Sequence, residues 1–272
     1  MKKAREILEH FLSVGTWLDY NNTVDKIIIG DPVKEIRSVI VTWMSTFDAL
    51  KEAANTGVDM VITHEPTFWE HSRELETMNT EIFNGIGEKK KEFIEKNGIV
   101  ILRCHDTWDR MPDIGIPWAW GRFLGFTANP AVISENGFLH RYDITPVSLE
   151  TFAESIAAKT AVIGEPVVQV CGNPEQMVSR IGIGTGCICN PADFAGLGCD
   201  AVIVCDDGTS YWREIQSAKD TEFPVIRVNH GTSEEPGMAS LADYVRLIFP
   251  DINCRHLPHG CCYRQVGSPS NI

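Results

Sequence analysis

The sequence predicts an α/β protein built from two α/β/α-type lobes with mostly parallel sheets. Apolar strand-like runs alternate with amphipathic helical patterns along nearly the whole chain. The length of 272 residues suits one or two domains. The alternation is lost at 127–137, a stretch rich in turn formers. Because strands that alternate with helices form βαβ units, we expect largely parallel sheets in lobes at 1–126 and 127–272.

The first lobe opens with an amphipathic helix over 4–18, in which Ile7, Leu8 and Phe11 share one face. Ser45 or Thr46 can cap a second helix that ends at Gly57. The other expected elements are strands at 36–43, 58–63 and 99–104, and a charged helical region from about 73 to 97 that is broken near Gly85 and Gly87.

The second lobe repeats the alternation with shorter elements. Its expected strands lie at 138–144, 166–171, 180–185, 200–205 and 224–229, and its expected helices at 148–160, 191–197, 210–219 and 237–248.

The composition narrows the classes of function. The net charge of −13, from 24 basic and 37 acidic residues, disfavours nucleic acid and anionic membranes as partners. No run approaches the roughly 20 apolar residues that span a bilayer. The first ten residues carry acids where a signal peptide has an apolar core. Together with nine cysteines that read as reduced, these features favour a cytoplasmic protein with no membrane partner.

Three predicted strands end in histidine. The run VDMVIT leads to His64 and Glu65, and IVILRC leads to His105, with Asp109 four residues later. The run PVIRVN leads to His230, with Glu234 four residues later. A spacing of four places two side chains on one face of a helical turn. In parallel α/β sheets, ligands bind outside the carboxyl ends of the strands, so we expect a shared site.

Imidazole and carboxylate groups are ligands for divalent Zn, Fe, Mn, Co or Ni. A single histidine at a strand end is usually a hydrogen-bonded structural residue, but three of them, each with a nearby acid, favour a metal site. Two divalent ions would carry four positive charges, and the carboxylates of Glu65, Asp109 and Glu234 would offset three of them. Such a cluster would reduce the cost of burying isolated charges.

The three motifs, in this order, resemble the Nif-three-like dinuclear metal-centre proteins, also labelled GTP cyclohydrolase 1 type 2 homologues. The matching segments are VITHEPTFW at 61–69, CHDTWD at 104–109 and NHGTSE at 229–234. The resemblance implies two metal ions in the cleft between the lobes and a homo-oligomer, typically a hexamer. It implies that the metal ligands are His64, Glu65, Asp109, His230 and Glu234. His105 is expected in the same pocket, either as a ligand or as a catalytic proton shuttle.

The sequence departs from the family pattern at Glu65, where the family has the second histidine of a pair. A carboxylate oxygen is a harder ligand than imidazole, so this change favours Mn or Fe over Zn.

The C-terminal segment 254–262 also contains metal-binding residue types, namely Cys254, His256, His259, Cys261 and Cys262. Their spacing is not a paired Cys-x-x-Cys framework. We therefore favour a loop or edge strand over an additional zinc site.

The leading hypothesis is a metal-dependent hydrolase that acts on a small molecule, either a nucleotide, another phosphoester or a cyclic amide. His105 would serve as general acid or base near neutral pH. The alternative is a non-catalytic metal carrier or a regulatory ring-shaped assembly. A metal-free scaffold is a third reading, and it requires the strand-end histidines to be coincidental.

Overall fold

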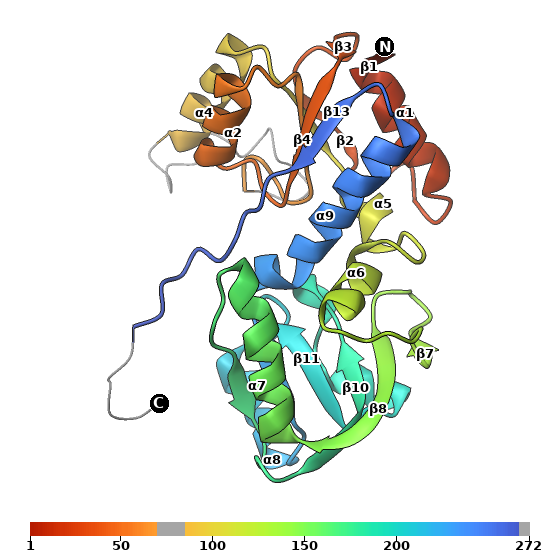
Figure 1. The fold of residues 1–272 in the computed structure, drawn as a ribbon, viewed down its shortest axis with the longest axis vertical. Coiled ribbons are helices and arrows are strands. Elements are labelled where there is room, and N and C mark those ends of the chain that lie inside the picture. The colour runs from red at the N-terminus through yellow and green to blue at the C-terminus, as the bar shows by residue number, and fades with distance from the viewer. Residues whose placement is uncertain (70–84, 267–272) are drawn as a thin grey trace. The chain divides into compact units, whose positions relative to one another are not determined.

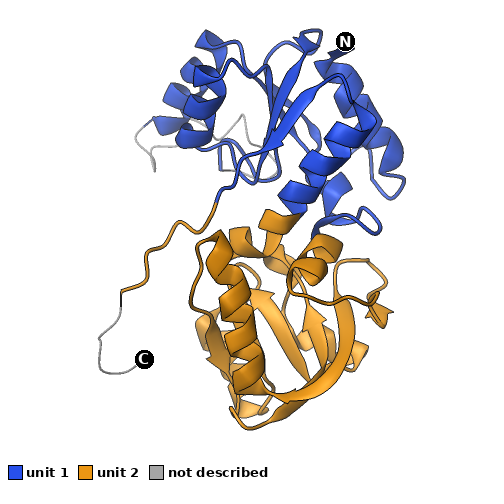
Figure 2. Ribbon diagram, in the orientation of Figure 1, with its two compact units in different colours: residues 1–116, 237–259 blue, residues 117–236, 260–272 orange. Residues whose placement is uncertain are grey.

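The computed structural model describes residues 1–69 and 85–266. The chain forms two compact units, Met1–Ile116 with Gly237–His259 and Pro117–Pro236 with Gly260–Ile272 (Figure 2). It therefore crosses between the units three times, whereas continuous lobes at 1–126 and 127–272 would need one crossing. The additional crossings arise because the chain returns to the first unit within a long helix and leaves it again after a final strand.

The first unit contains a five-stranded sheet in the order β13–β4–β5–β6–β2 (Figure 1). Its strands are β13 (Asn253–His256), β4 (Ser38–Thr42), β5 (Met60–Thr63), β6 (Val100–Arg103) and β2 (Lys26–Ile29). All neighbouring pairs are parallel except β2 with β6. Two short strands, β1 (Lys2–Lys3) and β3 (Glu35–Ile36), form a separate antiparallel pair. The expected parallel sheet is confirmed in this unit.

Helices cover both faces of this sheet. The helices of the unit include α1 (Ala4–Val14), α2 (Phe47–Asn55), α4 (Ile86–Lys96) and the one-turn α5 (Asp106–Asp109). Val39 and Val41 pack with α1 and the C-terminal part of α9 (His230–Ile248). Ile40, between those two valines, packs with α2 and α4 on the other face. This alternation along β4 produces the expected α/β/α layering.

Residues at the helix ends account for where α2 begins and where α1 ends. The Thr46 hydroxyl caps α2 by accepting a hydrogen bond from the backbone N–H of Ala49 at 3.2 Å. The helix expected over 4–18 ends earlier, at Val14, before Gly15. Residues 73–84 of the predicted charged helix lie outside the described residues.

The second unit contains a six-stranded sheet in the order β7–β8–β10–β11–β12–β9. Its strands are β7 (Val132–Ile133), β8 (His140–Ser148), β10 (Met177–Ile183), β11 (Ala201–Cys205), β12 (Val225–Val228) and β9 (Gln169–Cys171). Only β10–β11 and β11–β12 are parallel pairs. The prediction of a mostly parallel sheet was therefore wrong here. Apolar periodicity identifies a strand but not the direction of its partner.

The second unit has helical segments near 148–160, 191–197 and 210–219, as expected, but the sequence did not predict α6 (Ile116–Phe123), and α9 begins early. The other helices include α7 (Leu149–Thr160), α8 (Gln216–Asp220) and a 3-10 segment at Pro191–Leu197, with a single π turn at Tyr211–Ile215 before α8. α9 begins at His230, seven residues before the expected start at 237. Pro236 and Gly237 both lie inside this helix, although proline usually interrupts a helix.

Candidate metal centre

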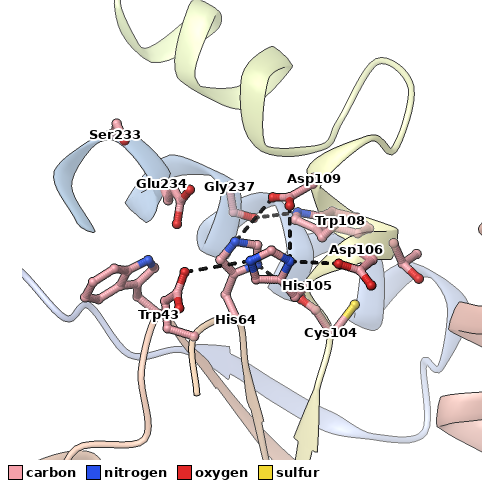
Figure 3. Close-up of polar contacts among 12 residues, drawn as sticks. Trp43, His64, Cys104, His105, Asp106, Trp108, Asp109, Ser233, Glu234 and Gly237 are labelled. Atoms are coloured by element: carbon pink, nitrogen blue, oxygen red, sulfur yellow. Dashed lines mark hydrogen bonds and ion pairs between the residues drawn. The ribbon is translucent and has the colours of Figure 1, made fainter. Parts of the chain in front are cut away.

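Parallel pairing brings two of the histidine motifs to one edge of the first sheet. β5 ends at Thr63 and β6 at Arg103, and these two residues are register partners. His64 and His105 follow the two strand ends. Their rings stack with centroids 4.3 Å apart and planes inclined by 10° (Figure 3). The ends of β5 and β6 therefore bring His64 and His105 together, as the sequence predicts for neighbouring parallel strands.

His64 is fully buried and faces a carboxylate. Its Nδ1 lies 3.3 Å from the carbonyl oxygen of Cys104, which can only accept a hydrogen bond. The proton of a neutral His64 ring therefore belongs on Nδ1, and Nε2 carries a lone pair. That Nε2 lies 3.3 Å from Oδ1 of Asp109. Two lone pairs at this distance need a positive charge between them, supplied by a proton or a metal ion.

Two aspartates and a glutamate surround His105. Its Nδ1 lies 3.2 Å from Oδ2 of Asp109 and 3.1 Å from Oδ1 of Asp106. Its Nε2 lies 3.8 Å from Oε1 of Glu65. The short α5 helix places His105 and Asp109 one turn apart, as their spacing predicted. Figure 3 shows Asp106 and Asp109 both directed toward this ring.

Asp106 is a residue that sequence reasoning missed. Burial alone would raise the pKa of its carboxyl group. Hydrogen bonds from the His105 ring, the backbone N–H of Val24 and the Thr23 hydroxyl outweigh burial and lower this pKa well below its usual value. The Thr23 and Val24 bonds measure 2.8 and 3.0 Å. Asp106 therefore remains ionised and can hold the proton of His105 on Nδ1.

Asp25, also missed, shapes the backbone of the same turn. Its Oδ1 accepts the N–H groups of His105 at 2.6 Å and Asp106 at 2.9 Å, and its Oδ2 accepts that of Thr107 at 2.8 Å. Burial raises the pKa of the Asp25 carboxyl group. The only local signal was an aspartate directly before the strand Lys26–Ile29, and the N–H groups that it accepts lie about 80 residues away in the sequence.

The donor set in this unit fits a divalent cation. One ligand atom each from His64, His105 and Asp109 can be chosen so that all three lie within 4.8 Å of one another. Atoms that share one ion with bonds of ~2.1 Å lie no more than about 4.2 Å apart. Asp109 lies within that distance of each ring through a different oxygen, with Oδ1 3.3 Å from His64 Nε2 and Oδ2 3.2 Å from His105 Nδ1. His64 and Asp109 therefore form a candidate metal-binding group, with His105 either as a further ligand or as a proton carrier beside it.

The third motif lies in the second unit, at the start of α9. His230 Nε2 and Glu234 Oε1 are 3.0 Å apart, one helical turn from each other, as the spacing predicted. The side chain of Asp206, which follows β11, accepts the backbone N–H of His230 at 2.6 Å through Oδ1. Asp207 Oδ2 lies 3.5 Å from Nδ1 of the same ring. The Asp206 bond holds the backbone of His230 at the helix start, whereas Asp207 and the buried Glu234 flank its ring.

Gly186 lies beside this histidine–glutamate pair. A Cβ atom at position 186 would lie 3.5 Å from both His230 Nε2 and Glu234 Oε1. The residue also has a φ of 62°, in the left-handed region that favours glycine. A glycine here therefore leaves open space beside the two candidate ligands.

The C-terminal cysteines and histidines have separate environments. Cys254 is buried in β13, and the ring of His259 lies 4.9 Å from that of Trp43. The thiol of Cys261 accepts a hydrogen bond from the Asn229 amide at 3.3 Å. Over residues 1–69 and 85–266, no group of three converging ligand atoms includes this segment.

No helix among the described residues is both long and apolar enough to cross a bilayer.

Comparison with known proteins identifies the family. The family model described as Duf34/NIF3 (NGG1p interacting factor 3) matches residues 1–258. A curated relative from Clostridium perfringens, named GTP cyclohydrolase 1 type 2 homolog, is 24% identical over 229 residues, which cover 81% of this chain and 82% of that protein.

Solved structures share the fold. Staphylococcus aureus protein SA1388 superposes with a TM-score of 0.77 at 16% identity, covering 97% of this chain and 99% of that one. The protein ybgI, described as of unknown function, gives a TM-score of 0.75 at 19% identity, covering 94% and 98% of the two chains. The match of the family model to almost the entire sequence shows that this chain belongs to the Duf34/NIF3 family.

Proposed function

We propose that the protein is a divalent-metal-dependent hydrolase with a dinuclear centre. The metal ligands would be His64, Glu65, Asp109, His230 and Glu234. The observation that carries the proposal is the buried Nε2 of His64 facing the carboxylate of Asp109 at 3.3 Å, an arrangement that needs a cation or a proton. The family resemblance and the order of the three motifs support assigning His230 and Glu234 to the same centre.

The ligand set indicates which metals would bind. Three of the five proposed ligands are carboxylates, and oxygen ligands favour Mn or Fe over Zn. Co and Ni are also compatible with the imidazole groups. Bound ions of this kind would supply Lewis acidity and a water molecule of lowered pKa.

His105 is the proposed general acid or base. Asp106 and Asp109 both lie within 3.2 Å of its Nδ1, so this nitrogen can keep its proton. The opposite nitrogen, Nε2, is then the atom that can accept a proton from water and return it to a leaving group. Oε1 of Glu65 lies 3.8 Å from this nitrogen.

The proposed substrates are a nucleotide, another phosphoester or a cyclic amide, in line with the name of the Clostridium perfringens relative. The test is a hydrolysis screen over these three classes with protein loaded with Mn, Fe, Co, Ni or Zn. We expect turnover with at least one metal and a loss of at least about 100-fold in His105→Gln, consistent with general acid–base catalysis.

His10→Gln is the matched control, because His10 lies in the first unit and bonds to the Tyr244 hydroxyl at 2.9 Å, outside the centre. It should retain full activity. Tight metal binding without turnover in any class would contradict the hydrolase and favour the carrier or regulatory assembly.

The state of assembly is a further part of the proposal. The resemblance implies a homo-oligomer, and we propose a hexamer of cytoplasmic location. Sedimentation equilibrium of the full chain should give a mass near six times 30.3 kDa. A monomeric mass would contradict this assembly.

A further inference from the structure

A polar cavity of about 550 Å³ lies in the second unit. Its walls come from β9 and β12, which pair at one edge of the sheet, and from C-terminal residues 263–266. Its volume is in the range of small-molecule pockets. Since β12 leads directly to His230, the cavity adjoins the chain segment that carries one of the proposed ligands.

Arg227 is the main cationic group in the cavity wall. Its Nη1 donates to the Gln169 side-chain oxygen at 3.0 Å, and its Nη2 lies 3.5 Å from the carbonyl oxygen of Asp206. Its Nε is buried and has no hydrogen-bond partner among the described residues. Guanidinium has five N–H donors, so these two contacts leave three for a ligand.

The neighbouring carboxylates are already engaged by backbone groups. Both oxygens of the buried Glu165 lie 3.1 Å from the N–H of Asn229. Oδ1 of Asp206 accepts the N–H of His230. Arg264 also lines the cavity, so two guanidinium groups are present in a chain whose net charge is −13. Arginine guanidinium groups bind carboxylate or phosphate oxygens.

We propose that Arg227 and Arg264 form a subsite for an anionic group of the substrate, either a phosphate or a carboxylate. Asp206 links this subsite to His230, because its carbonyl oxygen faces Arg227 and its carboxylate holds the His230 backbone. The inference deepens the proposed function: it places the charged end of the substrate in the cavity, beside the strand that leads to the candidate ligands.

The test is calorimetric titration of the full chain with inorganic phosphate and, separately, with acetate. The protein is first dialysed against EDTA so that neither anion can bind through a metal. We expect saturable binding of at least one anion. Tighter binding of phosphate would indicate a phosphate group in the substrate, and tighter binding of acetate would indicate a carboxylate. Arg227→Gln and Arg264→Gln should each weaken it at least about tenfold, whereas Arg227→Lys should retain part of the affinity.

Arg180→Gln is the matched control, because Arg180 lies in the same unit, pairs with Asp200 at 3.4 Å and does not line the cavity. It should bind the anion as the wild type does. Arg264 lies on an exposed segment, so its variant keeps the test valid even if Arg227→Gln fails to fold.

His230→Ala separates the subsite from the metal centre. The proposed function predicts that this variant loses metal, and the subsite predicts that it still binds the anion. If His230→Ala keeps its metal and still binds the anion, the proposed function is refuted and the subsite is not. The subsite is overturned if the wild type binds neither anion, if neither arginine variant weakens binding, or if binding is lost in His230→Ala.

Discussion

The carboxylate of Asp25 holds the backbone N–H of His105 at 2.6 Å, although the two residues are 80 positions apart in the sequence. Asp25 precedes β2, which pairs antiparallel with β6, and His105 follows β6. The sheet therefore brings the aspartate to the start of the turn that carries His105 and Asp109. The position of the candidate ligands depends on this buried acceptor.

Replacing Asp25 should weaken both the fold and the candidate centre. Asp25→Ala leaves three buried or half-buried N–H groups without their acceptor, at a cost of at least ~3 kcal/mol. Asp25→Asn keeps one accepting oxygen and should lose less. Urea unfolding measures the change in the free energy of unfolding. The metal content of the purified variants shows whether the turn that carries His105 and Asp109 still supports metal binding.

Asp31→Asn is the control for this substitution, because Asp31 is exposed and, within residues 1–69 and 85–266, its carboxylate accepts only the N–H of Val33 at 2.9 Å. It should change stability by less than about 0.5 kcal/mol. Equal effects of the two asparagine variants would show that Asp25 does not organise the turn.

His140 should make the protein less stable in acid. Burial in β8 lowers the pKa of its ring to about 4, from an ordinary value of 6.5. Between these pH values the unfolded state binds the proton and the folded state does not, so stability is present above 6.5 and is lost as the pH falls toward 4. The full loss is on the order of 3 kcal/mol.

His140→Phe preserves a ring of similar size beside Trp118 and removes the titration. Unfolding free energies measured from pH 7 to pH 4 should therefore fall less steeply in this variant than in the wild type. Parallel pH profiles of the two proteins would refute the assignment.

Gly186→Ala should affect stability and metal binding together. Its positive φ costs an alanine roughly 1–2 kcal/mol. The new methyl group would also lie 3.5 Å from His230 Nε2 and Glu234 Oε1 and narrow the space beside them. We expect weaker metal binding, measured by competition with a chromophoric chelator.

Gly98→Ala is the matched control. Gly98 has a φ of 60°, and a Cβ added there would meet no neighbouring side chain or backbone atom of the described residues within 4 Å. This variant should lose similar stability and leave metal affinity unchanged. If both variants bind metal as tightly as the wild type, the absence of a side chain at position 186 does not matter for metal binding by His230 and Glu234.

The parallel sheet of the first unit could be predicted from the sequence because β5 and β6 are mostly apolar runs with a helical pattern between them. That pairing alone brings His64 and His105 together. The spacing of four similarly predicted the pairs His105–Asp109 and His230–Glu234, which lie 3.2 and 3.0 Å apart.

Long-range features could not be read in the same way. Nothing in the sequence near Asp25 indicates that it supports His105, because the two residues lie in distant elements. Asp106 follows His105 directly, but Thr23 and Val24, which hold its carboxylate, are also distant in the sequence. The direction of β8 and β9 depends on sheet pairing rather than on periodicity. Tertiary packing also keeps Pro236 within α9, where local propensity predicts a break.

The most direct test of the central claim is metal content per chain by plasma mass spectrometry, on untagged protein purified without chelator. We predict about two transition-metal ions per chain in the wild type and in His10→Gln, and a clear loss in His64→Ala and in His230→Ala. A wild type that contains no metal and takes up none from Mn, Fe, Co, Ni or Zn would contradict the account, as would unchanged metal content in both alanine variants.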